Sequence, residues 1–200
     1  MPTGVALRDV RQQLFDAAER ILLRDGANGL TSRAVTTEAG VAKGVLHRHF
    51  EDFDAFLADL VGDRITRLEG QAATLRDSAG TGDVAGNLTG ALAGLFDPVA
   101  VSIVGLIIFR DELRVRLRQA RPAPGIPVLT EAATMVAAYL TEECEMGRIA
   151  ADADADALAL SLVGAGHLLF ADRERPAPGP GEVGRVVNAV IADVVQRRLL

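Results

Sequence analysis

Apolar residues recur every three or four positions along most of this chain, and that spacing constrains its fold more than any other feature. Such a rhythm places the apolar side chains on one face of an α-helix. It is clearest in residues 8–24 and 183–199. No segment shows the alternation with period two that marks a half-buried strand. The sequence therefore predicts an all-α fold.

Glycines, prolines and capping residues divide this pattern into separate helices. Asp25-Gly26 ends the first helix, Asp52 offers a cap for a long fourth helix, and a proline-rich linker covers residues 121–127. A bend or break is expected near Arg110-Asp111. The predicted helices cover residues 8–24, 31–38, 43–50, 54–76, 84–96, 97 to the linker at 121, 128–146, 154–170 and 183–199.

Length, charge and cysteine content limit the classes of protein that fit. Two hundred residues suit one or two domains, and 27 acidic against 21 basic residues argue against nucleic-acid binding by bulk charge. The single cysteine, Cys144, fits a reducing compartment. No signal peptide is apparent, and the longest apolar run, residues 99–109, falls short of the about 20 residues that span a membrane. We expect a cytoplasmic protein.

Residues 31–50 have the pattern of two short helices that meet at a sharp turn. Thr31 can cap the first helix, Ala39 is small enough for close approach, and Gly40 suits a positive φ at the turn. Apolar residues stand where packing on the preceding helix requires them: Val35, Ala39, Val41, Leu46 and Phe50. This pattern predicts a helix-turn-helix that exposes its second helix to a DNA major groove. A plain helical hairpin in a bundle is the alternative.

Residues 11–60 resemble the N-terminal domain of TetR/AcrR-family transcriptional regulators. The resemblance is carried, in the family's order and spacing, by Ala17-Ala18, Gly26, Thr31, Ala39-Gly40-Val41, Lys43-Gly44, Leu46, His49-Phe50 and Phe56-Leu57. It implies a helix-turn-helix DNA-binding domain at residues 1–53 and a helical ligand-binding and dimerisation domain at residues 54–200. It also implies a homodimer that binds double-stranded operator DNA, usually a repressor that a small molecule releases.

Carried over residue by residue, the resemblance makes residues 43–50 the recognition helix. Lys43 and Val45 would face base edges, because an ammonium suits guanine acceptors and a methyl group suits thymine. Phosphate contacts would fall to Thr31, Arg33, His47 and His49. The full predicted DNA-binding set is Thr31, Arg33, Lys43, Gly44, Val45, His47, Arg48 and His49.

Two departures from the family pattern bear on DNA binding. Ala42 lacks the hydroxyl that often caps the recognition helix, and Asp54 stands where a lysine commonly meets phosphate. Residues 1–56 hold seven bases and eight acids, although residues 33–50 hold three bases and one acid. The alternative function is therefore a helical small-molecule-binding protein with weakened or lost DNA binding.

The remaining helices are expected to bind an effector and a second subunit. With one Tyr and no Trp in the chain, we expect a small apolar or amphipathic effector rather than a flat aromatic cation. Its predicted pocket is lined by Leu95, Phe96, Ile103, Ile107, Phe109, Met135 and Tyr139. The predicted dimer interface comprises Leu162, Gly166, Phe170, Val187, Val190 and Val194. The alternative is that these two stripes fill the core of one subunit.

No arrangement in the sequence suggests catalysis. We find no Ser-His-Asp, Cys-His or paired-carboxylate pattern. His47 and His49 point about 200° apart on a helix and so do not share a metal. We expect neither an enzyme nor a cofactor nor a metal site. The expected mechanism is a population shift, in which the effector binds a dimer whose recognition helices are wrongly spaced for DNA.

Overall fold

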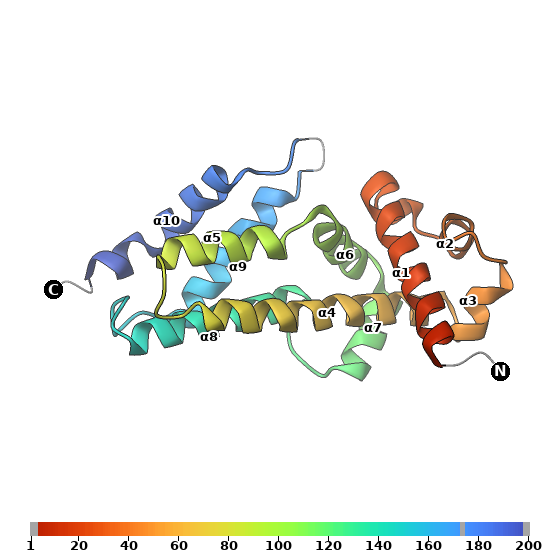
Figure 1. The fold of residues 1–200 in the computed structure, drawn as a ribbon, viewed down its shortest axis with the longest axis horizontal. Helices are drawn as coiled ribbons and strands as arrows, with labels where there is room; N and C mark the ends of the chain where they lie inside the picture. The colour runs from red at the N-terminus through yellow and green to blue at the C-terminus, as the bar shows by residue number, and fades with distance from the viewer. Residues whose placement is uncertain (1–3, 173–174, 198–200) are drawn as a thin grey trace. The chain divides into compact units, whose positions relative to one another are not determined.

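The computed structural model describes residues 4–172 and 175–197, and this part of the chain is helical without a strand (Figure 1). The predicted all-α class is confirmed. The elements are α1 (Gly4–Asp25), η1 (Ala27–Gly29), α2 (Ser32–Glu38), α3 (Gly44–His49), α4 (Phe53–Asp77), α5 (Val84–Leu95), α6 (Pro98–Phe109), α7 (Asp111–Ala120), α8 (Leu129–Glu145), α9 (Ala155–Phe170) and α10 (Pro180–Arg197).

The chain divides into two compact units, each discontinuous in sequence. Unit 1 comprises Met1–Asp63 and Ser102–Pro124, and unit 2 comprises Arg64–Val101 and Gly125–Leu200. Unit 1 therefore contains α1 to α3, the start of α4, most of α6 and all of α7. The domain division predicted after residue 53 stays a prediction. The last residue of the predicted final stripe, Leu199, lies outside the described residues.

Local capping sets the helix boundaries, as predicted. The Thr31 hydroxyl accepts a hydrogen bond from the backbone N–H of Ala34 at 3.1 Å and starts α2. A carboxylate oxygen of Asp52 accepts one from Ala55 N–H at 2.6 Å at the start of α4. The predicted break at Arg110 is also present, because this residue is extended, with φ −118° and ψ 102°, between α6 and α7.

Unit 1 packs around the apolar face of α1. Leu14, Ala18 and Ile21 have no exposed surface, and α2 lies against this helix. Phe15 of α1 also meets Phe50 and Phe56, with ring centroids 6.0 Å and 5.7 Å away. This aromatic cluster joins α1 to the end of α3 and the start of α4.

Unit 2 is a helical bundle in which α8 packs on α9, and α10 packs on α5 and α9 (Figure 1). Close approach of α9 to the end of α5 requires a glycine. A Cβ at Gly166 would lie 2.7 Å from a ring carbon of Phe96, nearer than real Cβ contacts allow. No single helix among the described residues is long and apolar enough to cross a membrane. The consecutive helices α5 and α6, which are bent relative to each other, reach the required length and apolar composition only together.

Candidate nucleic-acid interface

The α2–α3 corner has the geometry of a helix-turn-helix. Gly40 has φ 66°, the left-handed conformation that glycine adopts without strain. The N–H of Val41 then donates to the carbonyl of Thr36 at 3.0 Å and closes the end of α2. Leu46 is fully buried on one face of α3, so the opposite face of this short helix is available to a partner.

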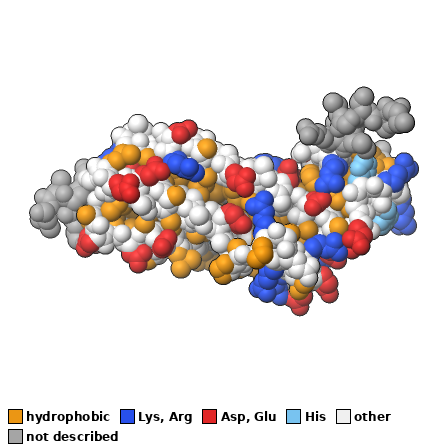
Figure 2. All heavy atoms as spheres, turned by 90° about the horizontal axis from the view of Figure 1, so that it is seen from below, with side chains coloured by type: hydrophobic (Ala, Val, Ile, Leu, Met, Phe, Trp, Pro, Cys, Tyr) orange, Lys and Arg blue, Asp and Glu red, His pale blue; other side chains and the backbone are white. Residues whose placement is uncertain are grey.

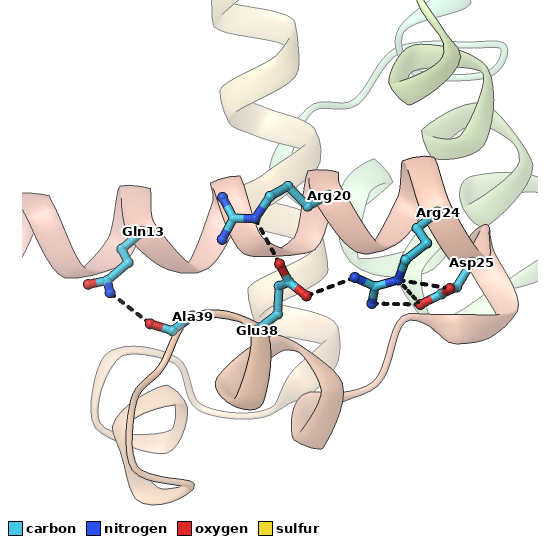
Figure 3. Close-up of polar contacts among 6 residues, drawn as sticks. All are labelled: Gln13, Arg20, Arg24, Asp25, Glu38 and Ala39. Atoms are coloured by element: carbon cyan, nitrogen blue, oxygen red, sulfur yellow. Dashed lines mark hydrogen bonds and ion pairs between the residues drawn. The ribbon is translucent and has the colours of Figure 1, made fainter.

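Polar side chains of α1 hold α2 in place (Figure 3). The side-chain amide of Gln13 donates to the carbonyl of Ala39 at 2.8 Å, at the end of α2. Arg20 and Arg24 contact the two oxygens of Glu38 at 2.9 Å and 3.0 Å. Hydrogen bonds from Arg20 and then Arg24 lower the pKa of Glu38. The carboxylate is therefore ionised and already paired at neutral pH.

Arg11 braces the other end of the recognition helix. Its guanidinium carbon lies 4.5 Å from the centroid of the Phe50 ring, within the range of a cation–π contact. It donates to the carbonyl of His49 at 3.4 Å and pairs with Asp59 of α4 at 2.5 Å. One side chain of α1 thus ties the last turn of α3 to α4.

The predicted DNA-binding residues lie on the outer side of this corner. Arg33, Lys43, Gly44, His47, Arg48 and Thr31 are exposed, and Val45 and His49 are half-buried. Figure 2 shows Lys, Arg and His side chains gathered at the end of unit 1 that carries α2 and α3. Their direct role in binding DNA stays a prediction.

Charge pairing explains how an acidic N-terminal segment presents a basic face. Among the described residues, Arg33, Lys43 and Arg48 have no ion-pair partner. The carboxylates near them in sequence are paired elsewhere. Glu38 pairs with α1, Glu51 and Asp52 pair with Arg116 of α7, and Asp54 pairs with Arg110, which precedes α7. The three cations are consequently exposed and available to phosphate.

The start of α3 lacks a side-chain cap. Lys43 precedes the helix with φ −47° and ψ −35° and makes no capping hydrogen bond. The N–H of Val45 donates to the carbonyl of Ala42 at 2.8 Å. This agrees with the expectation that Ala42 offers no capping hydroxyl.

Sequence reasoning missed the residues that hold this site together. Gln13 and Arg11 act from α1, Arg110 acts from the break before α7, and Arg116 acts from α7. The last two pair with residues 56 and 64 positions away. No short-range spacing marks such partners. Only the excess of carboxylates at residues 51–54 could have indicated that cations from elsewhere are needed.

Unit 2 contains an open cleft of about 370 Å³ between α4 and α5. One wall is α5, whose small residues leave space for the cleft: Gly86, Gly90, Ala91 and Gly94. The facing wall is α4, with Gln71, Thr74 and Leu75, and the lining is completed by Ser78, directly after α4, and Asn87 of α5. No ionised side chain lines this cleft.

The cleft has a different lining from the predicted effector pocket. Six of the predicted residues are buried core side chains in this structure, namely Leu95, Phe96, Ile103, Ile107, Met135 and Tyr139. Phe109 is instead 86% exposed, at the end of α6. None of the seven is among the residues that line the α4–α5 cleft.

Most of the predicted dimer-interface residues pack inside one subunit. Leu162, Gly166, Val187 and Val194 are buried, and Phe170 and Val190 are half-buried. Their burial favours the alternative that both stripes contribute to the core of one chain. The exposed apolar face of α9 is a different one and carries Leu160, 69% exposed, and Leu168, 76% exposed.

No group of three or more potential metal ligands occurs among the described residues.

Comparison with known proteins agrees with this geometry. Residues 14–60 match the family described as bacterial regulatory proteins, tetR family. A comparison with curated protein sequences gave no significant match. Residues 14–60, which contain α2 and α3, are thus similar to the TetR family of bacterial regulatory proteins.

Solved structures resemble the fold over nearly the whole chain. A TetR-family member from Streptomyces coelicolor A3 is 21% identical, with TM-score 0.62 and coverage of 90% of this chain and 97% of its own. A transcriptional regulator from Rhodococcus sp. Rha1 is 18% identical, with TM-score 0.66 and coverage of 94% and 96%. FadR from Bacillus subtilis, solved with stearoyl-CoA, is 16% identical, with TM-score 0.65 and coverage of 92% and 97%. At these identities the likeness is one of fold.

Proposed function

We propose that this protein is a ligand-responsive repressor that binds operator DNA as a homodimer through α2 and α3. The observation that carries the proposal is the charge distribution of unit 1. Arg33, Lys43 and Arg48 are exposed without an ion-pair partner among the described residues, whereas Glu38, Asp52 and Asp54 are paired. Cations on an exposed helix-turn-helix provide the phosphate contacts that dominate affinity for DNA.

Fluorescence anisotropy on DNA fragments that flank the protein's own gene tests this proposal. We expect saturable binding to one fragment. The affinity for a shuffled fragment of equal length should be at least about tenfold lower. The affinity should fall steeply between 50 and 200 mM salt, because each phosphate contact releases counterions. Equal, weak binding to all fragments would contradict the proposal and favour the alternative, a helical small-molecule-binding protein that has lost DNA recognition.

The homodimer is expected to form through α9. Exposed residues at positions 157, 160, 161, 164 and 168 follow helical spacing, so Leu160 and Leu168 lie on one face with the small residues Ala157, Ser161 and Gly164. Two copies that bury this face would pair two recognition helices by two-fold symmetry. Leu160→Lys should give monomers in sedimentation velocity without a loss of helicity. Met146→Lys, at an exposed apolar residue outside α9, is the matched control.

The effector is expected to bind the α4–α5 cleft as a neutral, largely apolar molecule with one hydrogen-bond donor. The volume lies within the range of about 300–1,000 Å³ that is usual for ligand pockets. The side-chain oxygen of Gln71 is buried without a hydrogen-bond partner among the described residues, while its nitrogen donates to the carbonyl of Gly94 at 3.1 Å. A ligand hydroxyl or amide N–H would satisfy this acceptor.

Thermal shift measurements with 1-decanol and its methyl ether test this assignment. The alcohol should raise the melting temperature more than the ether, because only the alcohol donates a hydrogen bond. Gly90→Leu should abolish the shift, since a Cβ at Gly90 meets nothing within 4 Å and the side chain would fill the cleft. Gly70→Leu, at an exposed helical glycine of α4 with equally open surroundings, is the control. Equal shifts in both variants would contradict the assignment.

A further inference from the structure

Three carboxylates follow the recognition helix directly. Glu51, Asp52 and Asp54 lie within five residues of His49, the last residue of α3. A free helix N-terminus attracts phosphate, but here Asp52 already accepts the N–H of Ala55. Unpaired carboxylates at this position would repel a DNA backbone that approaches α3. The negative charge at the start of α4 must therefore be neutralised if unit 1 is to bind DNA.

Two arginines of the α7 region provide that compensation. Arg110, which precedes α7, places a guanidinium nitrogen 2.8 Å from a carboxylate oxygen of Asp54. Arg116 lies 2.7 Å from Asp52 and 3.8 Å from Glu51. Arg110 also lies over the ring of Phe53, with its guanidinium carbon 5.8 Å from the ring centroid. All of these residues belong to unit 1.

The surroundings of these pairs are otherwise acidic. A hollow of about 670 Å³ beside them is lined by Glu51, Asp52, Asp54, Asp111 and Glu112, together with Val115, Arg116 and Gln119. Asp111 pairs with Arg114 of its own helix. Arg116 is the one cation among the residues that line this hollow, so removal of Arg110 or Arg116 would leave an unpaired carboxylate directly after the recognition helix.

We propose that Arg110 and Arg116 are positioning residues for DNA binding. They neutralise Asp54 and Asp52 and fix the start of α4, so that α3 can approach the phosphate backbone. The inference rests on the proposed function and extends it, because it assigns a role in operator affinity to a segment outside residues 14–60. Neither arginine needs to touch DNA for this role.

Operator affinity of Arg110→Gln and Arg116→Gln, measured by fluorescence anisotropy, tests the proposal. Half-exposed ion pairs contribute modestly, but each is present twice in a dimer, so we expect each variant to bind about three- to thirtyfold more weakly. The loss should be smaller at 300 mM than at 50 mM salt, because screening weakens the repulsion. Arg118→Gln is the matched control, since it removes the same charge from α7 at an exposed residue that has no ion-pair partner among the described residues.

A second substitution separates compensation from direct phosphate contact. Asp54→Asn in the Arg110→Gln background removes the unpaired charge, so it should restore most of the affinity. Asp52→Asn should do the same for Arg116→Gln, and asparagine keeps the cap on α4. The two arms are independent, so the test survives if one arginine variant fails to fold, which its melting temperature and helicity would reveal.

The outcomes distinguish this inference from the proposed function. Unchanged affinity in both arginine variants, relative to Arg118→Gln, would overturn the inference alone. A loss that neither asparagine restores would also overturn it, because it would indicate direct contact with phosphate. A wild-type protein that binds no fragment specifically would overturn the proposed function and the inference together.

Discussion

Nε of Arg148 lies 3.1 Å from a carboxylate oxygen of Glu143, whose side chain has no exposed surface. The other oxygen of Glu143 accepts from the N–H of Gly80 at 3.3 Å, and Arg148 donates to the carbonyl of Gly82 at 2.7 Å. This buried pair therefore joins the end of α8 to the loop between α4 and α5 in unit 2.

Arg148→Ala should lower the free energy of unfolding by about 3 kcal/mol, because it leaves a buried carboxylate unpaired. Urea denaturation monitored by circular dichroism measures this change. The double variant Arg148→Ala/Glu143→Gln should recover part of the loss, since a neutral amide is cheaper to bury than a charge. A single variant as stable as the wild type would show that the pair contributes nothing.

Lys43 is the cation best placed at the start of the recognition helix, and its replacement tests base reading. Lys43→Ala should weaken specific binding by roughly 1–3 kcal/mol if the ammonium contacts base edges. Binding to operator variants with single base changes is the measurement, with Arg76→Ala in unit 2 as a control for loss of charge. An unaltered order of preference among these operators would remove Lys43 from the residues that read bases.

Ala42→Ser should stabilise α3, because the structure shows that this helix begins without a side-chain cap. A serine hydroxyl at position 42 can accept from the N–H of Val45, whose bond to the Ala42 carbonyl is 2.8 Å long. The gain in stability should be about 0.5–1 kcal/mol, and amide exchange in α3 should slow. Ala42→Val, which adds bulk without an acceptor, is the control and should produce neither effect.

His167 should make the stability of unit 2 depend on pH. Burial lowers the pKa of this imidazole below its ordinary value of 6.5, and its Nδ1 has no hydrogen-bond partner among the described residues. The imidazole is therefore protonated more readily in the unfolded chain than in the folded chain. The free energy of unfolding consequently falls as the pH drops below about 6.5. Melting curves from pH 7.5 to 5 should show this decline in the wild type.

His167→Gln supplies the comparison for that series, since glutamine does not titrate. Its melting temperature should change less between pH 7.5 and 5 than that of the wild type. The lowered pKa values of Glu38 and Asp52 affect stability only in more acidic solution, because carboxylates ionise at lower pH. An identical pH dependence in both proteins would contradict the assignment to His167.

The sequence by itself determined the helices and the helix-turn-helix. The Thr31 and Asp52 caps, the positive φ of Gly40 and the break at Arg110 were all predictable from residues within a few positions. Such features depend on steric limits and hydrogen bonds between near neighbours in the chain. The face of α3 that is exposed also follows locally, because Leu46 must be buried on the opposite side.

Only the tertiary structure decided which charges cancel and which apolar faces stay exposed. Asp54 reads in the sequence as a repulsive carboxylate, but Arg110 pairs with it from 56 residues away. Leu162 and Leu168 are equally apolar, yet α9 buries the first within its own subunit and exposes the second. These outcomes depend on how distant helices pack. That packing depends on contacts between segments far apart in the sequence, and the local sequence pattern does not indicate which segments meet.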